Sequence, residues 1–228
     1  MKILLFGATG MIGQAALREC LRADDVEQIV AIGRTATGNH HLHFREIVRS
    51  DLFDYGPIED DLKGFDACFF CLGVSSAGMT ESNYAHLTYD LTIAAAVVLA
   101  RLNPGMTFVY VSGAGTDNTE SGRSMWARVK GRTENALQRL PFKAVYLLRP
   151  AVILPMHGER SNVRAYRVFY GLAGPFLRAV QRLAPSRFLN TEVLGRAMLE
   201  LARHGGPQPI LEASDIYLTA TRRSEQHP

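Results

Sequence analysis

Three glycines near the amino terminus, Gly7, Gly10 and Gly13 in the stretch GATGMIG, are spaced for phosphate binding. They follow the apolar run KILLF and precede a helix-forming run, so the loop joins a strand to a helix. The tight turn after the strand favours glycine, and a pyrophosphate can approach the backbone closely only where side chains are absent. The start of the helix adds unpaired N–H groups that can bind the phosphates. We therefore predict a dinucleotide site here. Its predicted contacts are Gly7, Thr9, Gly10, Met11, Ile12 and Gly13.

The residue after the second strand decides which dinucleotide binds. A carboxylate there would hydrogen-bond the ribose hydroxyls of NAD, but the strand EQIVAIG ends at Gly33 and Arg34 follows it. The planar guanidinium of Arg34 can hold a 2′-phosphate instead. We expect NADP(H) in preference to NAD(H), with an arginine that is merely solvated as the alternative.

Two further stretches lie where the same ligand would pass. Asp51 and Leu52 follow the third strand, where the carboxylate can contact the adenine amine and the leucine can cover the ring. Cys71, Leu72 and Gly73 end the fourth strand, and a glycine there lets a cofactor approach the backbone. These five residues complete the predicted cofactor site.

The elements that must position these residues alternate along the first 150 residues. Six strands are predicted at KILLFG, EQIVAIG, HFREIV, DACFFCLG, MTFVYVS and KAVYLLRP. Helices are predicted at Met11–Ala23, Glu81–Leu102 and Ser124–Leu140. Strands that are apolar nearly throughout are typical of a parallel sheet covered on both faces. Repeated strand–helix–strand units therefore predict an α/β fold with a doubly wound, Rossmann-type sheet.

The pattern changes after Pro150. The predicted elements are a basic helix at Val163–Leu183, a helix at Thr191–Arg203 and a short strand at Pro209–Glu212. We expect a single domain over residues 1–228, with a cofactor-binding core at 1–155 and a small helical cap at 156–228. The basic helix can pack its apolar side on the sheet, lie on an anionic membrane surface, or close over a substrate.

The order of these motifs resembles the short-chain dehydrogenase/reductase superfamily. The motifs are GATGMIGQ, GRT, SDL, FCLGVS, VSGAG and VKGRTENAL. They are similar to those of its atypical, epimerase-like, NAD(P)H-binding branch, and within it to the oxidoreductases related to the HIV Tat-interacting protein. The resemblance covers about residues 1–155. It implies a Rossmann fold and a pyridine nucleotide.

The resemblance also implies a chemical site, with one departure. In that superfamily a serine at the end of the fifth strand, and a tyrosine and a lysine four residues apart on the next helix, serve proton transfer during hydride exchange. The serine maps onto Ser112 and the lysine onto Lys130, which is also implied to contact the nicotinamide ribose. Trp126 stands at the tyrosine position. Its indole N–H only donates a hydrogen bond, so Trp126 can cover a ligand but cannot be the general acid.

Three functions remain open from the sequence. The first is an NADP(H)-dependent oxidoreductase acting on a small or apolar carbonyl or alcohol, with Ser75 and Tyr84 as candidate substrate contacts. The alternative, favoured by Trp126, is a module that binds NADP(H) without turnover, as a sensor or as a surface for a partner. The third, an epimerase or isomerase, would also need a base. Other candidate proton donors are Ser76, His86 and Tyr110.

Composition excludes several other classes. A net charge of +3 over 228 residues does not indicate nucleic acid as a partner. Cys68 and Cys71 are three apart on a strand and point to opposite faces, so they cannot share a metal or a disulfide. The cluster His40, His41 and His43 has no carboxylate or cysteine to complete a site, and we expect no metal.

The amino-terminal apolar run stops at Gly7, which is too short for a signal peptide. The sequence contains no run of 18 consecutive apolar residues, the length that a transmembrane helix needs. We therefore expect a cytoplasmic protein.

Overall fold

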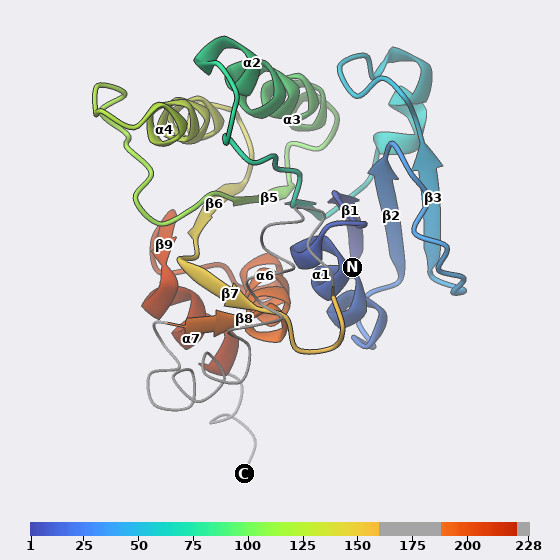
Figure 1. Ribbon diagram of the computed structural model, residues 1–228. Coiled ribbons are helices and arrows are strands. Elements are labelled where there is room, and N and C mark those ends of the chain that lie inside the picture. The colour runs from blue at the N-terminus through green and yellow to red at the C-terminus, as the bar shows by residue number, and fades with distance from the viewer. Residues whose placement is uncertain (160–187, 223–228) are drawn as a thin grey trace.

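One parallel sheet of seven strands forms the centre of the computed structural model, which describes residues 1–159 and 188–222. The strand order is β3-β2-β1-β4-β5-β6-β9 (Figure 1). The strands are β1 (Lys2–Phe6), β2 (Gln28–Gly33), β3 (Phe44–Val48), β4 (Ala67–Phe70), β5 (Thr107–Val111), β6 (Ala144–Arg149) and β9 (Ile210–Glu212). All six predicted strands are present, and the order confirms the Rossmann-type α/β fold.

The strands at the middle of the sheet are buried on both faces, as their apolar sequences predict. Ile3 to Phe6 of β1 have no exposed surface, and every residue of β4 and β5 is buried. At the edge, β3 is only partly buried, and its Arg45 turns outward to pair with Asp61 at 2.8 Å. The difference follows from position, because an edge strand has one neighbour instead of two.

Helices cover both faces of the sheet (Figure 1). They are α1 (Met11–Leu21), α2 (Glu81–Ala85), α3 (Leu91–Leu102), α4 (Met125–Leu137), α6 (Thr191–His204) and α7 (Ala213–Thr221), with a 3-10 helix η1 at Gly56–Leu62. One face packs against α1, α6 and α7, through residues such as Leu17 and Met198. The other packs against η1, α3 and α4, through residues such as Leu99 and Leu137.

The contact between α1 and α6 is close enough to require a glycine. A Cβ built at Gly195 of α6 would lie 3.1 Å from the Ala15 carbonyl oxygen and 2.8 Å from Cγ of Glu19, both in α1. The missing side chain lets the two helix backbones approach each other. An early helix and a late helix of the chain therefore share one buried seam.

The predicted helix at Glu81–Leu102 is continuous but not uniform. His86–Asp90, between α2 and α3, form a π-helix, a distortion that is frequent at functional sites. The 22-residue stretch is long and apolar enough to cross a membrane by length and composition, with mean hydropathy 1.3. Helices that cover a sheet meet the same criterion, and Ala95 and Leu99 pack on this sheet.

The carboxyl-terminal part differs from the predicted cap. The predicted helix and strand are present as α6 and β9, but β9 pairs with β6 as the seventh strand, and α6 lies on the sheet beside α1. Residues 188–222 therefore extend the core itself, because the apolar face of α6 is buried against α1. The predicted basic helix at 163–183, with its suggested membrane contact, lies outside the described residues.

A second, two-stranded parallel sheet was not predicted. It pairs β7 (Val152–Leu154) with β8 (Phe188–Asn190). Each strand has only three residues, too few for an alternation to stand out in the sequence.

The two cysteines of the CxxC pair face opposite sides of the sheet, as predicted. Cys68 lies in the core on the α3 side, whereas Cys71 packs on the α1 side. Burial raises the pKa of Cys68 well above its usual value and that of Cys71 to about 12. Neither thiol is prepared for nucleophilic or redox chemistry.

Candidate functional site

The strand order reverses direction around β1, which pairs with both β2 and β4. In open α/β sheets, ligands bind at such a switch point, beyond the carboxyl ends of the strands. The loop GATGMIG leaves β1 at this point and enters α1. The topology therefore places the glycine loop where a ligand is expected.

The backbone of this loop has no space for side chains at two of its glycines. A Cβ at Gly13 would lie 2.0 Å from the Gly7 carbonyl oxygen. Gly7 has a φ of +80°, and a Cβ there would lie 2.8 Å from the carbonyl carbon of Cys71. The first turn of α1 holds no acidic residue, so nothing opposes an anion at its amino end. These features fit a pyrophosphate.

A pocket of about 200 Å³ opens beside the loop. Its lining includes eight of the predicted cofactor residues: Gly7, Thr9, Gly10, Arg34, Leu52, Cys71, Leu72 and Gly73. Sequence reasoning missed Thr35, Thr37, Glu46, Ile47 and Val48, which also line it. The sequence carries no signal for Glu46, because the register of β3 against β2 brings this residue of FREIV to the pocket.

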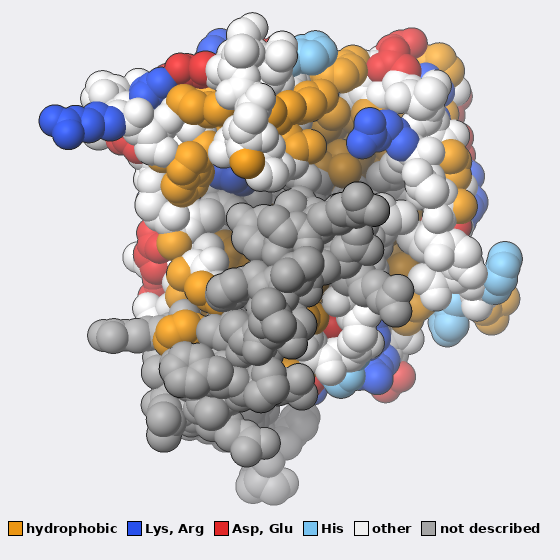
Figure 2. Space-filling view, viewed as in Figure 1, with side chains coloured by type: hydrophobic (Ala, Val, Ile, Leu, Met, Phe, Trp, Pro, Cys, Tyr) orange, Lys and Arg blue, Asp and Glu red, His pale blue; other side chains and the backbone are white. Residues whose placement is uncertain are grey.

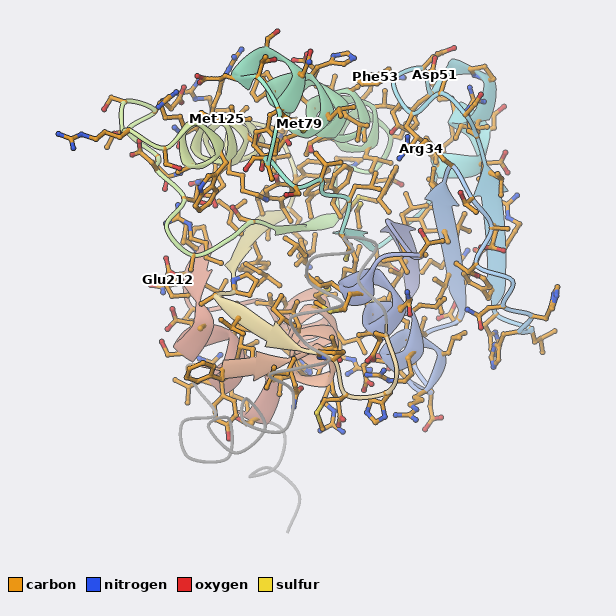
Figure 3. The ribbon with its side chains drawn as sticks, in the orientation of Figure 1. Arg34, Asp51, Phe53, Met79, Met125 and Glu212 are labelled. Carbon is orange, nitrogen blue, oxygen red and sulfur yellow. The ribbon has the colours of Figure 1, made fainter. Side chains whose placement is uncertain are left out.

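Five predicted cofactor residues do not line the pocket, and one of them, Lys130, lies instead at the end of β5. Met11, Ile12 and Gly13 belong to the first turns of α1. Asp51 is exposed, and its Oδ1 accepts a hydrogen bond from the Phe53 amide at 2.7 Å, so its carboxylate serves its own turn. Figure 3 shows Asp51 and Phe53 together, at the end of the molecule where Arg34 lies.

Arg34 directly follows β2, is exposed and is one of the residues that line this pocket; Figure 3 labels its position. Its guanidinium has no hydrogen bond or ion pair with any residue in 1–159 or 188–222. Arg49, by contrast, donates to the Asp51 and Asp54 carbonyl oxygens at 3.4 and 3.2 Å. Arg34 is therefore the arginine that is free to meet an anionic ligand here.

The second part of the site begins where β5 ends. Ser112 follows β5 and is 8% exposed. Its Oγ lies 3.0 Å from Oγ1 of Thr116, which donates to the Gly113 carbonyl oxygen at 2.8 Å. Either hydroxyl can donate in the contact between Ser112 and Thr116. When Thr116 donates to Ser112 instead of to Gly113, the Ser112 proton stays available to the oxygen of a ligand. The serine is held in one orientation.

Lys130 of α4 reaches the same strand end. Its Nζ lies 3.4 Å from the Val111 carbonyl oxygen, one residue before Ser112, and 5.2 Å from the centre of the Tyr110 ring. Burial lowers the pKa of Lys130 to about 8, and the charge of Glu134 offsets this only in part. Glu134 is itself paired with Arg149 at 2.5 Å. Lys130 thus reaches the end of β5, which Ser112 follows directly in the chain.

Trp126 lies one turn before Lys130, against the loop that follows Ser112. Its ring atoms come within 3.9 Å of a Cβ position at Gly113 and 3.6 Å of one at Gly115. Gly115 has a φ of +85°, which favours glycine, and its missing side chain makes room for the indole. Trp126 therefore packs over a glycine turn at the site.

The start of α4 is fixed by a close backbone contact. A Cβ at Gly131 would lie 1.8 Å from the Asp117 carbonyl oxygen, so the helix rests directly on the loop. The Asp117 amide in turn donates to the Ala127 carbonyl oxygen at 3.1 Å. These contacts set the position of the Trp126–Lys130 turn.

The other candidate proton donors are buried or already hydrogen-bonded. Tyr84 is 2% exposed, and burial raises its pKa. Burial also raises the pKa of Tyr110 above its usual range. Ser75 Oγ accepts from the Ala77 amide at 3.3 Å, and His86 pairs with Asp90 at 3.1 Å. None of these groups is arranged as a replacement for the family tyrosine.

The histidine cluster forms no metal site in the described part of the chain. No group of three or more His, Cys, Asp or Glu side chains there could hold a metal ion. The rings of His41 and His43 are 5.6 Å apart, and Nδ1 of His43 is 2.9 Å from the Glu27 carbonyl oxygen.

Comparison with protein families gives one match. Residues 3–121 match the NAD dependent epimerase/dehydratase family, which is more than half of the chain and includes the glycine loop, Arg34 and Ser112.

Curated relatives span most of the chain. Protein FMP52-2, mitochondrial, of Scheffersomyces stipitis is 28% identical over 90% of this chain and 88% of its own length. Protein FMP52, mitochondrial, of Eremothecium gossypii is 32% identical over 71% of this chain and 69% of its own. Protein HTATIP2 of Rattus norvegicus is 24% identical over 74% and 70%. The last of these agrees with the branch that the motifs resemble.

Solved structures share the fold at low identity. The enzyme WbmG of Bordetella bronchiseptica, in complex with NAD, superposes with a TM-score of 0.67 at 15% identity, covering 100% of this chain and 79% of that one. An oxidoreductase of the short-chain dehydrogenase/reductase family from Burkholderia thailandensis gives 0.66 at 15% identity, covering 99% and 98%.

The names of the relatives contradict one prediction. The cytoplasmic location rested on the absence of a targeting signal, whereas six fungal relatives are named as mitochondrial proteins. The cytoplasmic prediction was therefore wrong, because failing to recognise a leader is weak evidence for a compartment.

Proposed function

The chain belongs to the NAD dependent epimerase/dehydratase family, as an atypical short-chain dehydrogenase/reductase, and from that premise we propose that it is an NADP(H)-dependent oxidoreductase. Its substrate is a small or apolar carbonyl or alcohol. The observation that carries the proposal is the conjunction of a glycine-lined pocket at the end of β1 with Ser112 and Lys130 at the end of β5. The pocket would bind the nucleotide, and Ser112 would orient the carbonyl group. Both lie at the carboxyl ends of the parallel strands, where ligands bind in such folds.

The nucleotide is held by backbone and by one free cation. Gly7, Gly10 and the start of α1 hold the pyrophosphate, and Arg34 meets the 2′-phosphate. Leu52 and Leu72 supply apolar surface to the adenosine half. A bound nicotinamide would supply or accept the hydride.

The protein's own groups then orient the substrate and hold a proton. Ser112 is fixed by its bond to Thr116 and presents its hydroxyl toward a carbonyl or alcohol oxygen. Lys130 holds a proton at Nζ with a pKa of about 8, close to physiological pH, and contacts the nicotinamide ribose. Trp126 excludes water from the turn after Ser112 and cannot move a proton itself.

Apolar groups near this end favour an apolar substrate. Met79, before α2, and Met125, at the start of α4, lie on neighbouring segments (Figure 3). Figure 2 shows hydrophobic side chains gathered across the upper part of this face, where Figure 1 places α2 to α4. Such a surface retains an aliphatic or aromatic carbonyl better than a nucleotide sugar.

The test separates binding from turnover. Purified protein is titrated with NADPH and with NADH by nicotinamide fluorescence, and then incubated with NADPH and a panel of aliphatic and aromatic aldehydes and ketones while absorbance at the nicotinamide band is followed. Tighter binding of NADPH and substrate-dependent oxidation support the proposal. Failure of both nucleotides to bind would contradict it entirely.

A second candidate function is favoured by Trp126 alone. The chain would then bind NADP(H) without turnover, as a sensor or a partner-binding module. Binding of NADPH without oxidation in the presence of any panel member, together with activity gained by Trp126→Tyr, would select this function over the first.

A further inference from the structure

Among the residues that the structure describes, Glu46 supplies the only carboxylate in the lining of the nucleotide pocket. It is a partly buried residue of β3, and it stands opposite Ala31 of β2, which also lines the pocket. Paired residues of parallel strands point to the same face, so Glu46 and Ala31 lie on one side of the sheet. The described lining of the pocket therefore carries two opposite charges, the carboxylate of Glu46 and the guanidinium of Arg34.

The carboxylate is held in place by the loop that carries Arg34. Oε1 of Glu46 accepts a hydrogen bond from the Thr37 amide at 2.7 Å. The chain from Arg34 to Thr37 thus folds back over β3. Oε2 of Glu46 has no hydrogen bond or ion pair with any residue of the described ranges. Arg34 has no acidic partner in those ranges either, so the two charges remain available to a ligand.

A carboxylate in this position treats the two nucleotides differently. It can accept a hydrogen bond from a ribose hydroxyl, but it repels a 2′-phosphate, which carries up to two negative charges. Arg34 does the reverse, since it attracts the phosphate. The selectivity of such a pocket is the difference between these two terms.

We propose that Glu46 determines cofactor specificity by opposing Arg34, so that the pocket takes NADH as well as NADPH and prefers NADPH only modestly. This inference rests on the proposed nucleotide-binding function. It assigns to Glu46 two separable actions: its charge disfavours the 2′-phosphate, and its Oε1 positions the Arg34 loop.

The isosteric variant Glu46→Gln separates these actions, because an amide oxygen can still accept from the Thr37 amide while the charge is gone. We expect the Kd for NADPH to fall by about 3- to 10-fold, with the Kd for NADH unchanged or slightly raised. The same selective gain is expected for adenosine 2′,5′-bisphosphate against adenosine 5′-monophosphate by calorimetry. Glu46→Ala should weaken both nucleotides, since the loop loses its anchor.

Two controls complete the test. Asp61→Asn removes a carboxylate that does not line the pocket and should leave both Kd values unchanged. In Arg34→Gln, the added Glu46→Gln change should still lower the Kd for NADPH, because the repulsion between the Glu46 carboxylate and the 2′-phosphate does not depend on Arg34. Equal effects of Glu46→Gln on NADPH and NADH, or none, would overturn the inference while leaving the function intact. No binding of either nucleotide by the wild type would overturn the function and this inference together.

Discussion

The nucleotide end of the proposed site, from Gly7 to Gly13, and the chemical end, from Ser112 to Lys130, are built from different parts of the chain. The first works through backbone, because its glycines bring N–H groups and a helix start to the ligand, and a side chain at Gly7 or Gly13 would collide with neighbouring backbone. The second works through side chains whose proton affinity matters. Trp126 in place of a tyrosine changes the second end without touching the first. A backbone site and a side-chain site can therefore diverge independently.

The largest effect is expected at the backbone end, from Gly13→Ala. The added methyl would lie 2.0 Å from the Gly7 carbonyl oxygen, so the loop must shift. We expect NADPH affinity to fall by at least about 100-fold and the free energy of unfolding by about 2–4 kcal/mol. Fluorescence titration and urea denaturation measure both. Gly105→Ala, where nothing lies within 4 Å, is the matched control and should change neither.

At the chemical end, Lys130→Met should abolish turnover, with a loss of about 100-fold or more in kcat. It should also change stability with pH. Because burial lowers the pKa of Lys130 to about 8 from 10.5, the buried charge costs stability fully below pH 8, and this cost is relieved between pH 8 and 10.5. Wild-type stability therefore gains with rising pH in that window, relative to the variant.

Urea denaturation at pH 7 and pH 10 measures this change. The variant should exceed the wild type in free energy of unfolding by about 1–3 kcal/mol at pH 7, and the gap should close by pH 10. Lys63→Met, which removes an exposed lysine paired with Asp60, should show no such closure. A gap independent of pH would mean that the Lys130 ammonium is well solvated.

Trp126→Tyr tests whether the chemical end lacks only its proton donor. A hydroxyl one turn from Lys130 would have its pKa lowered by the ammonium, and we expect carbonyl reduction to rise by about 10- to 100-fold. Trp126→Phe keeps an aromatic ring at the same position but has no hydroxyl, so its rate of carbonyl reduction should not rise. Equal rates of carbonyl reduction in the two variants would contradict the idea that the missing tyrosine hydroxyl limits activity. Steady-state oxidation of NADPH is the measurement.

The smallest effect is expected from Arg34→Gln, which leaves the backbone site intact and removes one cation. The Kd for NADPH should rise by about 10-fold with little change for NADH, since only the 2′-phosphate contact is lost. Parallel titrations of the two nucleotides give the ratio. Arg45→Gln, on the neighbouring strand but paired outward with Asp61, is the matched control.

The same contrast explains what the sequence could predict. Strands, the first helices and the glycine loop were predictable, because apolar runs and glycine spacing are local patterns. Leu52 and Leu72, which line the pocket, could be predicted as cofactor contacts because each comes shortly after a predicted strand. Glu46 and Thr37 did not, because their contact joins two segments whose register only the folded sheet sets. The depressed pKa of Lys130 likewise depends on burial by neighbours far away in the sequence.

The cap was predicted from the change of pattern after Pro150, and here local reasoning misled. An amphipathic helix such as α6 shows that it has an apolar face, but not which surface that face meets. Its partner proved to be α1, about 180 residues earlier in the chain. Non-local packing of this kind leaves no pattern in a single sequence.

The seam between α1 and α6 bears on how the protein is made. During synthesis, the glycine loop and α1 leave the ribosome well before Gly195 and the apolar face of α6. Until then Leu17 and its neighbours on α1 lack their cover. A nascent chain of this design therefore exposes a hydrophobic helix face from the emergence of α1 until α6 has been made, and this exposed face favours association with other chains or with chaperones.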